Sequence, residues 1–132
     1  MKTLELEETQ YGSSQQALPW AQATKEADEG EVQSLFKAES LTGTGFTTRV
    51  DWGNKHGQWK LNLNWGSVNQ RSRVFVAIGE GAAGGPDGGK FIGAARYTLH
   101  NVAPRAGGVD IWVDIEWGSD IRIYVDYLVV NP

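Results

Sequence analysis

The feature that most constrains the fold is an alternation of apolar and polar residues that dominates the chain from Glu31 to its end. Successive side chains of a β-strand point to opposite faces of its sheet, so this period of two predicts strands with one buried and one solvated face. The alternation is clearest in four segments: 46–52, 59–65, 109–117 and 121–129.

Weaker patterns complete the set of expected strands. Residues 74–78 are apolar on both faces, as in a central strand, and residues 90–102 form a longer strand of smaller side chains. Segment 31–40 is predicted as a strand, although Leu35 also fits a helix, and segment 3–8 could supply a further strand. Because turn-forming residues separate these segments, we predict an all-β fold: an antiparallel β-sandwich of jelly-roll-like type with about seven or eight strands.

Two segments fall outside the alternation. Residues 17–29, which include Trp20, are predicted to form a short helix or an irregular connection. Residues 79–89 contain six glycines and are predicted to be a mobile surface loop, since glycine loses the most backbone freedom on ordering. This loop lacks the Gly-Lys-Ser/Thr element of a phosphate-binding loop, and its two acids, Glu80 and Asp87, are too few for a Ca²⁺ site.

Length and composition limit the classes of protein that fit. A chain of 132 residues suits one domain, 1–132, around one core. The absence of cysteine excludes disulfides and thiolate chemistry, and only His56 and His100 are available for a histidine metal site. A net charge of −4 argues against binding nucleic acid through its phosphates. No apolar run reaches the length of a transmembrane helix or a signal peptide, which predicts a cytoplasmic protein or one exported without a conventional signal peptide.

Segments that follow one another in the chain suggest two antiparallel hairpins, whose registers follow from their inward faces. In the first hairpin Trp52 opposes Trp59, and in the second, within residues 109–130, Trp117 opposes Ile121. The second register also predicts these inward-facing residues: Ile111, Val113, Ile115, Ile123, Val125 and Tyr127. Trp-Gly pairs end three of the segments and suggest large inward indoles that close the ends of the sandwich: Trp52, Trp65 and Trp117.

The outer face of the second hairpin carries the main candidate site. Its register places Trp112 and Tyr124 diagonal to one another, with Asp114 and Asp126 beside them. A tryptophan on a polar face needs a cover, and the apolar face of a sugar ring can supply one while carboxylates accept hydrogen bonds from its hydroxyls. The competing covers are segment 17–29 and a subunit contact.

A second candidate lies on the outer face of the first hairpin, where Asn62 and Asn64 present planar amides that suit polyol recognition. Together the two faces favour a non-catalytic, lectin-like protein that binds glycans with no cofactor and no metal. An enzyme is disfavoured because the chain has no Gly-x-Ser-x-Gly motif, and because carboxylates on a flat outer face would lie in water, where their pKa values stay ordinary.

Two other classes of function stay open. One is a membrane-active toxin or pore-forming subunit, whose tryptophans and tyrosines would bind a membrane surface. The other is a structural protein that assembles into a homo-oligomer through its edge strands. A lectin with one weak site per chain would also favour a homo-oligomer, because several copies multiply the affinity.

Overall fold

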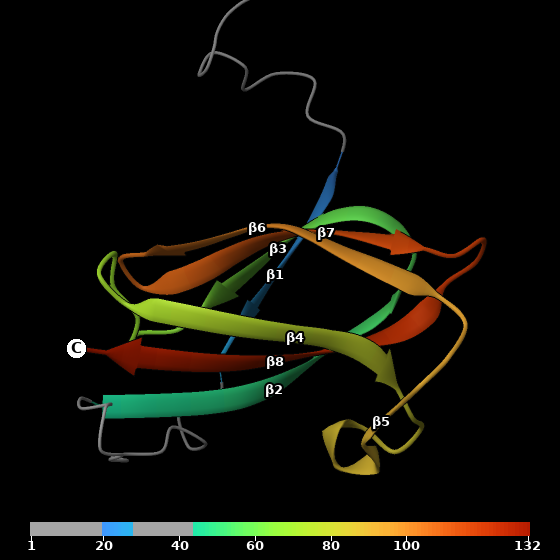
Figure 1. The fold of residues 1–132 in the computed structure, drawn as a ribbon, viewed down its shortest axis with the longest axis horizontal. Helices are drawn as coiled ribbons and strands as arrows, with labels where there is room; N and C mark the ends of the chain where they lie inside the picture. Colours follow the sequence, from blue (N-terminus) through green and yellow to red (C-terminus); the bar gives the residue numbers. More distant parts are fainter. Residues whose placement is uncertain (1–19, 28–43) are drawn as a thin grey trace, which may run out of the picture.

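The protein is a two-layer β-sandwich (Figure 1). The structure, a computed structural model, describes residues 20–27 and 44–132, so the expected strands at 3–8 and 31–40 lie outside the described residues. One sheet has the strand order β1-β3-β7-β6 and the other β2-β8-β4-β5. The strands are β1 (Ala21–Glu26), β2 (Thr44–Lys55), β3 (Gly57–Asn64), β4 (Arg73–Gly81), β5 (Lys90–Phe91), β6 (Arg96–Arg105), β7 (Gly108–Glu116) and β8 (Ile121–Asn131), with a 3-10 turn η2 at Pro86–Gly88. The predicted all-β sandwich is therefore confirmed.

The two predicted hairpins are wrong, because each pair of consecutive strands is divided between the two sheets. Strand β2 pairs with β8, from Thr44↔Asn131 to Lys55↔Ile121. Strand β3 pairs with β7, from Gly57↔Ile115 to Asn64↔Gly108. The segment that contains β2 and β3 thus pairs with the segment that contains β7 and β8. Together they form one long antiparallel ribbon that bends from one sheet into the other, as in a jelly roll. Alternation determines which side chains face inward, but it does not say which strand lies beside which.

The inward face of the ribbon is as predicted. Ile115 and Ile123 have 1% and 0% of their surface exposed, whereas Glu116 is exposed and Arg122 is partly exposed. The other members of the predicted inward set are also buried: Ile111, Val113, Val125 and Tyr127. These side chains fill the space between the two sheets and form the middle of the hydrophobic core.

The helix expected within residues 17–29 is wrong over the described part of that segment. Ala21–Glu26 is a strand that pairs parallel with β3, from Ala21↔Trp59 to Glu26↔Asn64. This is a parallel pair in an otherwise antiparallel arrangement. The open edge of β3 offers unpaired backbone groups, and such tertiary pairing overrides a weak local preference for helix. Directly after the strand, the Ala27 amide donates to the Asn64 carbonyl oxygen at 2.6 Å.

The three Trp-Gly positions do not play the same part. Trp52 and Trp65 are each 1% exposed, which confirms them as inward side chains. The Trp52 indole Nε1 also donates to the Tyr127 hydroxyl at 3.2 Å inside the core. Trp117 is 43% exposed, so its predicted inward position is wrong. It follows the last residue of β7, where the chain leaves one sheet for the other and the period of two no longer applies.

Candidate functional site

The division of the ribbon between two sheets also divides the six predicted site residues. Trp112, Asp114, Asn62 and Asn64 lie on one sheet, and Tyr124 and Asp126 on the other. The predicted joint surface of Trp112 and Tyr124 is therefore wrong. We call the first outer surface the β7 face: Gln22, Thr24, Glu26, Gln58, Lys60, Asn62, Asn64, Thr98, His100, Asn101, Arg105, Asp110, Trp112 and Asp114. We call the second the β8 face: Thr47, Arg49, Asp51, Phe75, Ala77, Lys90, Arg122, Tyr124, Asp126 and Leu128.

Trp112 stands at the centre of an aromatic cluster on the β7 face. The His100 ring stacks on the Trp112 ring with centroids 4.2 Å apart and an interplanar angle of 23°. Trp20 meets the same indole edge-on at 4.9 Å and 62°. The indole Nε1 donates to Gln58 Oε1 at 2.8 Å, which fixes the ring across the neighbouring strand β3. Segment 17–29 therefore contributes a contact to Trp112, which nevertheless stays partly exposed, and His100 itself is exposed.

Sequence reasoning missed His100 because its position depends on a local irregularity. The pairing of β6 with β7 shifts between Leu99 and Asn101, so an extra residue is inserted in β6. Such a bulge re-aims a side chain that strict alternation would place elsewhere. The only sequence signal for His100 is weak: it is one polar aromatic residue in a segment without clear alternation of apolar and polar residues.

A second part of the β7 face is a closed network of hydrogen bonds that holds β1 to β3. The Asn62 amide donates to Gln22 Oε1 at 3.1 Å and to Thr24 Oγ1 at 3.2 Å. The Asn64 amide donates to Glu26 Oε2 at 2.6 Å. These partners all lie on β1, so the two predicted asparagines use their amide donors to fix the edge strand.

The acceptor side of the network continues on the next strands. Arg105 Nη2 donates to Asn64 Oδ1 at 2.8 Å, and Arg105 Nε lies 3.1 Å from both carboxylate oxygens of Asp110. Asn62 Oδ1 is buried and has no hydrogen-bond partner. The network is thus almost fully engaged within the sheet, and Asn62 and Asn64 have little left to offer a ligand.

The polar residues around Trp112 differ from this network. Lys60 and Asn101 lie directly beside Trp112 on the two neighbouring strands, and Asp114 lies two residues further along β7. Within residues 20–27 and 44–132, no side-chain hydrogen bond or ion pair engages these three groups. They offer a cation, an amide and a carboxylate next to a partly exposed aromatic stack.

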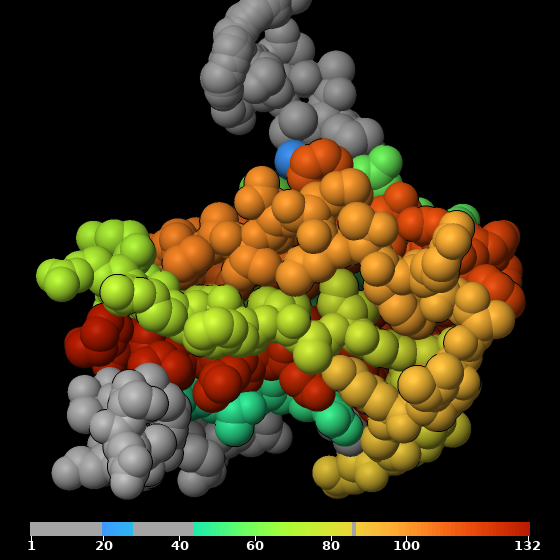
Figure 2. Space-filling view, viewed as in Figure 1, coloured from blue at the N-terminus to red at the C-terminus, as the bar shows by residue number. Residues whose placement is uncertain are grey.

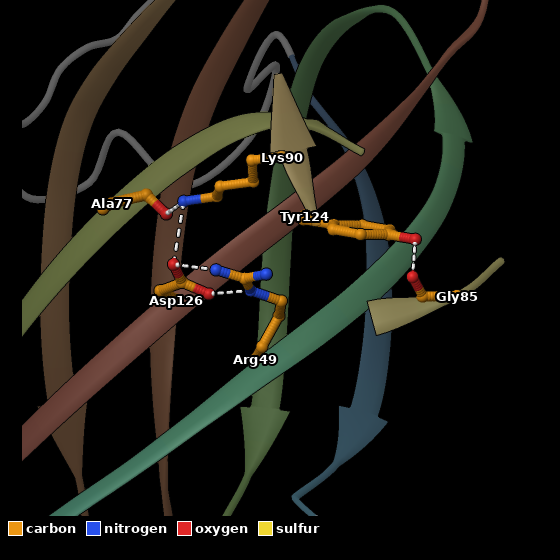
Figure 3. Close-up of polar contacts among 6 residues, drawn as sticks. All are labelled: Arg49, Ala77, Gly85, Lys90, Tyr124 and Asp126. Atoms are coloured by element: carbon orange, nitrogen blue, oxygen red, sulfur yellow. Dashed lines mark hydrogen bonds and ion pairs between the residues drawn. The ribbon is translucent and has the colours of Figure 1, made fainter. Parts of the chain in front are cut away.

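On the β8 face, Asp126 is held by two cations (Figure 3). Arg49 donates from Nε at 2.6 Å and from Nη2 at 3.0 Å, one bond to each carboxylate oxygen. Lys90 Nζ donates to Asp126 Oδ2 at 3.0 Å and to the Ala77 carbonyl oxygen at 3.0 Å. Partial burial on its own would raise the pKa of Asp126, but the hydrogen bonds and charges of Arg49 and Lys90 outweigh it and hold the pKa below its ordinary value.

Tyr124 has no exposed surface, so it cannot serve as a stacking platform. Its ring lies under the loop 82–89, and its hydroxyl is placed to donate to the carbonyl oxygen of Ala82, at 2.8 Å, or of Gly85 (Figure 3). The loop closes on itself as well, because the Ala82 amide donates to the Gly89 carbonyl oxygen at 2.9 Å. The glycine-rich segment predicted to be a mobile surface loop thus covers the Tyr124 ring, while its mobility stays a prediction.

A shallow groove of about 190 Å³ opens on the β8 face beside Asp126, lined by Thr47, Phe75, Val76, Ala77, Asp126, Tyr127 and Leu128. Phe75 is 60% exposed and Leu128 is 41% exposed. Strand β4 is central, as its apolar pattern predicted, but β5 pairs with it only at Glu80 and Gly81, so Phe75 lies beyond the part that β5 covers.

Three comparisons give this chain no relatives: no protein-family model, no curated protein and no solved structure matches it. In the part of the chain that the structure describes, no group of three or more metal-binding side chains comes together. No helix among the same residues is long and apolar enough to cross a bilayer. The two faces themselves are therefore the only features of the described residues from which a function can be inferred.

Proposed function

We propose that the protein is a non-catalytic, lectin-like carbohydrate-binding protein and that its ligand lies on the β7 face over Trp112 and His100. The observation that carries the proposal is a partly exposed aromatic stack, bordered by three polar side chains that have no partner among the described residues. A buried or structural aromatic pair would be covered, and its polar neighbours would be engaged, as Asn62 and Asn64 are.

The chemistry of the neighbours fits a polyol. The C–H face of a sugar ring would lie on the exposed imidazole of His100 or on the free part of the Trp112 indole. The Asp114 carboxylate accepts hydrogen bonds, the Lys60 ammonium donates them, and the Asn101 amide does both. A hydroxyl group is donor and acceptor at once, so a ring with several hydroxyls can satisfy all three groups.

The affinity of one such site is low. Base–aromatic stacking in nucleic-acid proteins contributes about 1–3 kcal/mol, and a sugar face has no larger contact area. The β7 face is also open to solvent, so little apolar surface of the ligand is removed from water and the hydrophobic contribution to binding is small. Useful binding would need several linked copies, which makes a homo-oligomer part of the proposal.

The test compares the stacked pair of Trp112 and His100 on one sheet with the exposed Phe75 on the other. Trp112→Ala and His100→Ala should each abolish or strongly weaken binding to an array of immobilised oligosaccharides, while Phe75→Ala on the β8 face should bind like the original protein. Circular dichroism and thermal melting check that each variant is folded. Equal binding by all three variants would refute the site, and loss only in Phe75→Ala would move it to the groove on the β8 face.

Asp114→Asn supplies a graded control. The amide keeps the size of the carboxylate but loses its charge and one acceptor, so we expect weaker glycan binding with unchanged stability. Since Asp114 has no partner among the described residues, a loss of stability would contradict its assignment to the ligand site.

A further inference from the structure

One strand of the sandwich is held to the rest almost entirely by polar contacts. Strand β1 lies at the edge of its sheet, and every residue in it except Ala23 is exposed. Only Ala23 and Ala27, which follows the strand directly, pack against the hydrophobic core. We call residues 20–27 the β1 strap. Two alanine methyl groups bury little apolar surface, and a segment with so few buried contacts opens locally at low cost.

The way the strap pairs with the sheet is also weak. Strand β1 runs parallel to β3 along its whole length, and parallel pairs are slightly less stable per residue than antiparallel ones. Partial burial lowers the pKa of Lys55, and the positive charge of Lys25 lowers it further, so these two lysines repel one another. Under the strap, Asn62 Oδ1 is buried without a hydrogen-bond partner among the described residues, which costs free energy. The closed position of the strap is therefore only weakly favoured.

The strap occupies groups that a sugar on the β7 face would use. Trp20 meets the Trp112 indole edge-on, with ring centroids 4.9 Å apart. The amide donors of Asn62 and Asn64 are bound to strap side chains at distances from 2.6 to 3.2 Å. In Figure 2 the blue end of the strap reaches the surface beside orange residues of β6 and β7. Opening of the strap would therefore free two amides and part of an indole on one face.

We propose that the β1 strap is an autoinhibitory element of the β7 face, displaced by an oligosaccharide that extends from Trp112 to Asn62 and Asn64. The inference rests on the proposed function and adds a ligand class to it. Asn64 lies four residues along β3 from Lys60, which pairs with Trp112, so the stretch is about 13 Å long, more than one sugar ring spans. A monosaccharide over Trp112 leaves the strap closed, whereas a chain of linked sugars competes with it. The apparent dissociation constant for the chain is then raised by the small fraction of molecules in which the strap is open.

Two aspartate substitutions on the same strand test whether the strap can be released. Ala23→Asp places a charge against the core and should detach the strap, whereas Ala21→Asp adds the same charge at an exposed position and should leave it closed. Trypsin digestion followed by mass spectrometry measures release without any glycan. Cleavage after Lys25 should be at least about tenfold faster in Ala23→Asp than in Ala21→Asp or the original protein, because proteolysis follows the open population. Thermal melting by circular dichroism checks that the sandwich stays folded.

The affinity for glycans then measures the inhibition. Ala23→Asp should bind immobilised oligosaccharides at least about threefold more tightly, because the freed amides add hydrogen bonds and the cost of opening is removed. Its affinity for a monosaccharide should be unchanged, and Ala21→Asp should match the original protein for both ligands. Glu26→Ala is a second variant that leaves the core contacts intact. It releases only the Asn64 amide, so it should give a smaller gain for oligosaccharides.

The remaining outcomes overturn the proposal in distinguishable ways. If Ala23→Asp is cleaved after Lys25 no faster than the original protein, the strap is not displaceable. If the strap is released but the affinity for oligosaccharides stays the same or falls, the strap does not inhibit binding, while the sugar site itself stands. Equal gains for a monosaccharide would remove the oligosaccharide as the ligand that displaces the strap. If neither the original protein nor any variant binds a glycan, the proposed function fails and the inhibitory role fails with it.

Discussion

The packing of Tyr124 under the glycine loop makes Gly81 the position in β4 that tolerates a side chain least. A methyl group at Gly81 would lie 2.3, 2.4 and 2.6 Å from three carbons of the Tyr124 ring. Carbon atoms pack at about 3.5–4.0 Å, so the ring or the strand would have to move by more than 1 Å. The Tyr124 ring cannot move aside to make room, because it has no exposed surface and its hydroxyl is hydrogen-bonded to the loop that covers it.

Gly79 offers a matched control two residues earlier on the same face of the same strand. A methyl group there would lie 3.1 Å from two side-chain carbons of Lys90, which is a flexible aliphatic chain that can shift by a few tenths of an ångström. Neither glycine has a positive φ angle, so the backbone accepts alanine at both positions. The two substitutions therefore differ only in what the new methyl group meets.

We expect Gly81→Ala to lower the free energy of unfolding by about 1–3 kcal/mol, the usual cost of overpacking. Gly79→Ala should be nearly neutral or slightly stabilising, because alanine reduces the freedom of the unfolded chain by an equivalent of about 0.4–1 kcal/mol. Urea denaturation with a shared m-value measures both. Limited proteolysis should also cut Gly81→Ala faster within residues 82–89. Equal stability of the two variants would refute the packing of the loop on Tyr124.

Three further predictions concern the core and two titrating groups. Ile115→Ala should cost about 2–5 kcal/mol in urea denaturation, from lost transfer energy and a cavity between the sheets; a loss under about half a kcal/mol would contradict its place in the core. Burial raises the pKa of Tyr127 in the folded protein, even though the hydrogen bond from Trp52 opposes the rise. The neutral Tyr127 hydroxyl therefore makes its full contribution to the free energy of unfolding below about pH 10, and this contribution is lost as pH rises toward the folded-state pKa. Alkaline denaturation of Tyr127→Phe should show a weaker pH dependence in that range, and an unchanged curve would contradict it. Because the pKa of Asp126 is lowered, its contribution is present above about pH 4 and is lost as pH falls through the folded-state pKa; urea midpoints of Asp126→Asn between pH 6 and pH 2 should lose that slope.

The sequence predicts the layers of this fold better than its connections. Ile115 and Ile123 could be placed in the core from alternation alone, since the period of two needs no knowledge of a strand's neighbour. The pairing of β2 with β8 could not, because it joins segments that lie far apart in the chain. A short connection between consecutive strands favours a hairpin locally. Here the two halves of the ribbon lie in different sheets instead, and both bury their inward side chains in the core between the sheets.

The candidate site shows the same limit. Alternation places Trp112 on an outer face, as the structure has it, and Asn62 and Asn64 lie on that face because β3 pairs with β7. Alternation also predicts an outward Tyr124, but the loop 82–89 covers it, and no local pattern indicates that a glycine-rich segment will fold over a ring. His100 reaches Trp112 only through a bulge, whose position depends on the pairing of β6 with β7.

The measurement that tests the central claim most directly is a titration with oligosaccharides followed by the indole N–H signals of the six tryptophans. The signal of Trp112 and the ring signals of His100 should shift together and give one dissociation constant. The signals of the buried Trp52 and Trp65 should stay in place. Shifts confined to the backbone signals of Phe75 and Leu128, or no shift at any glycan concentration, would contradict a carbohydrate site on the β7 face.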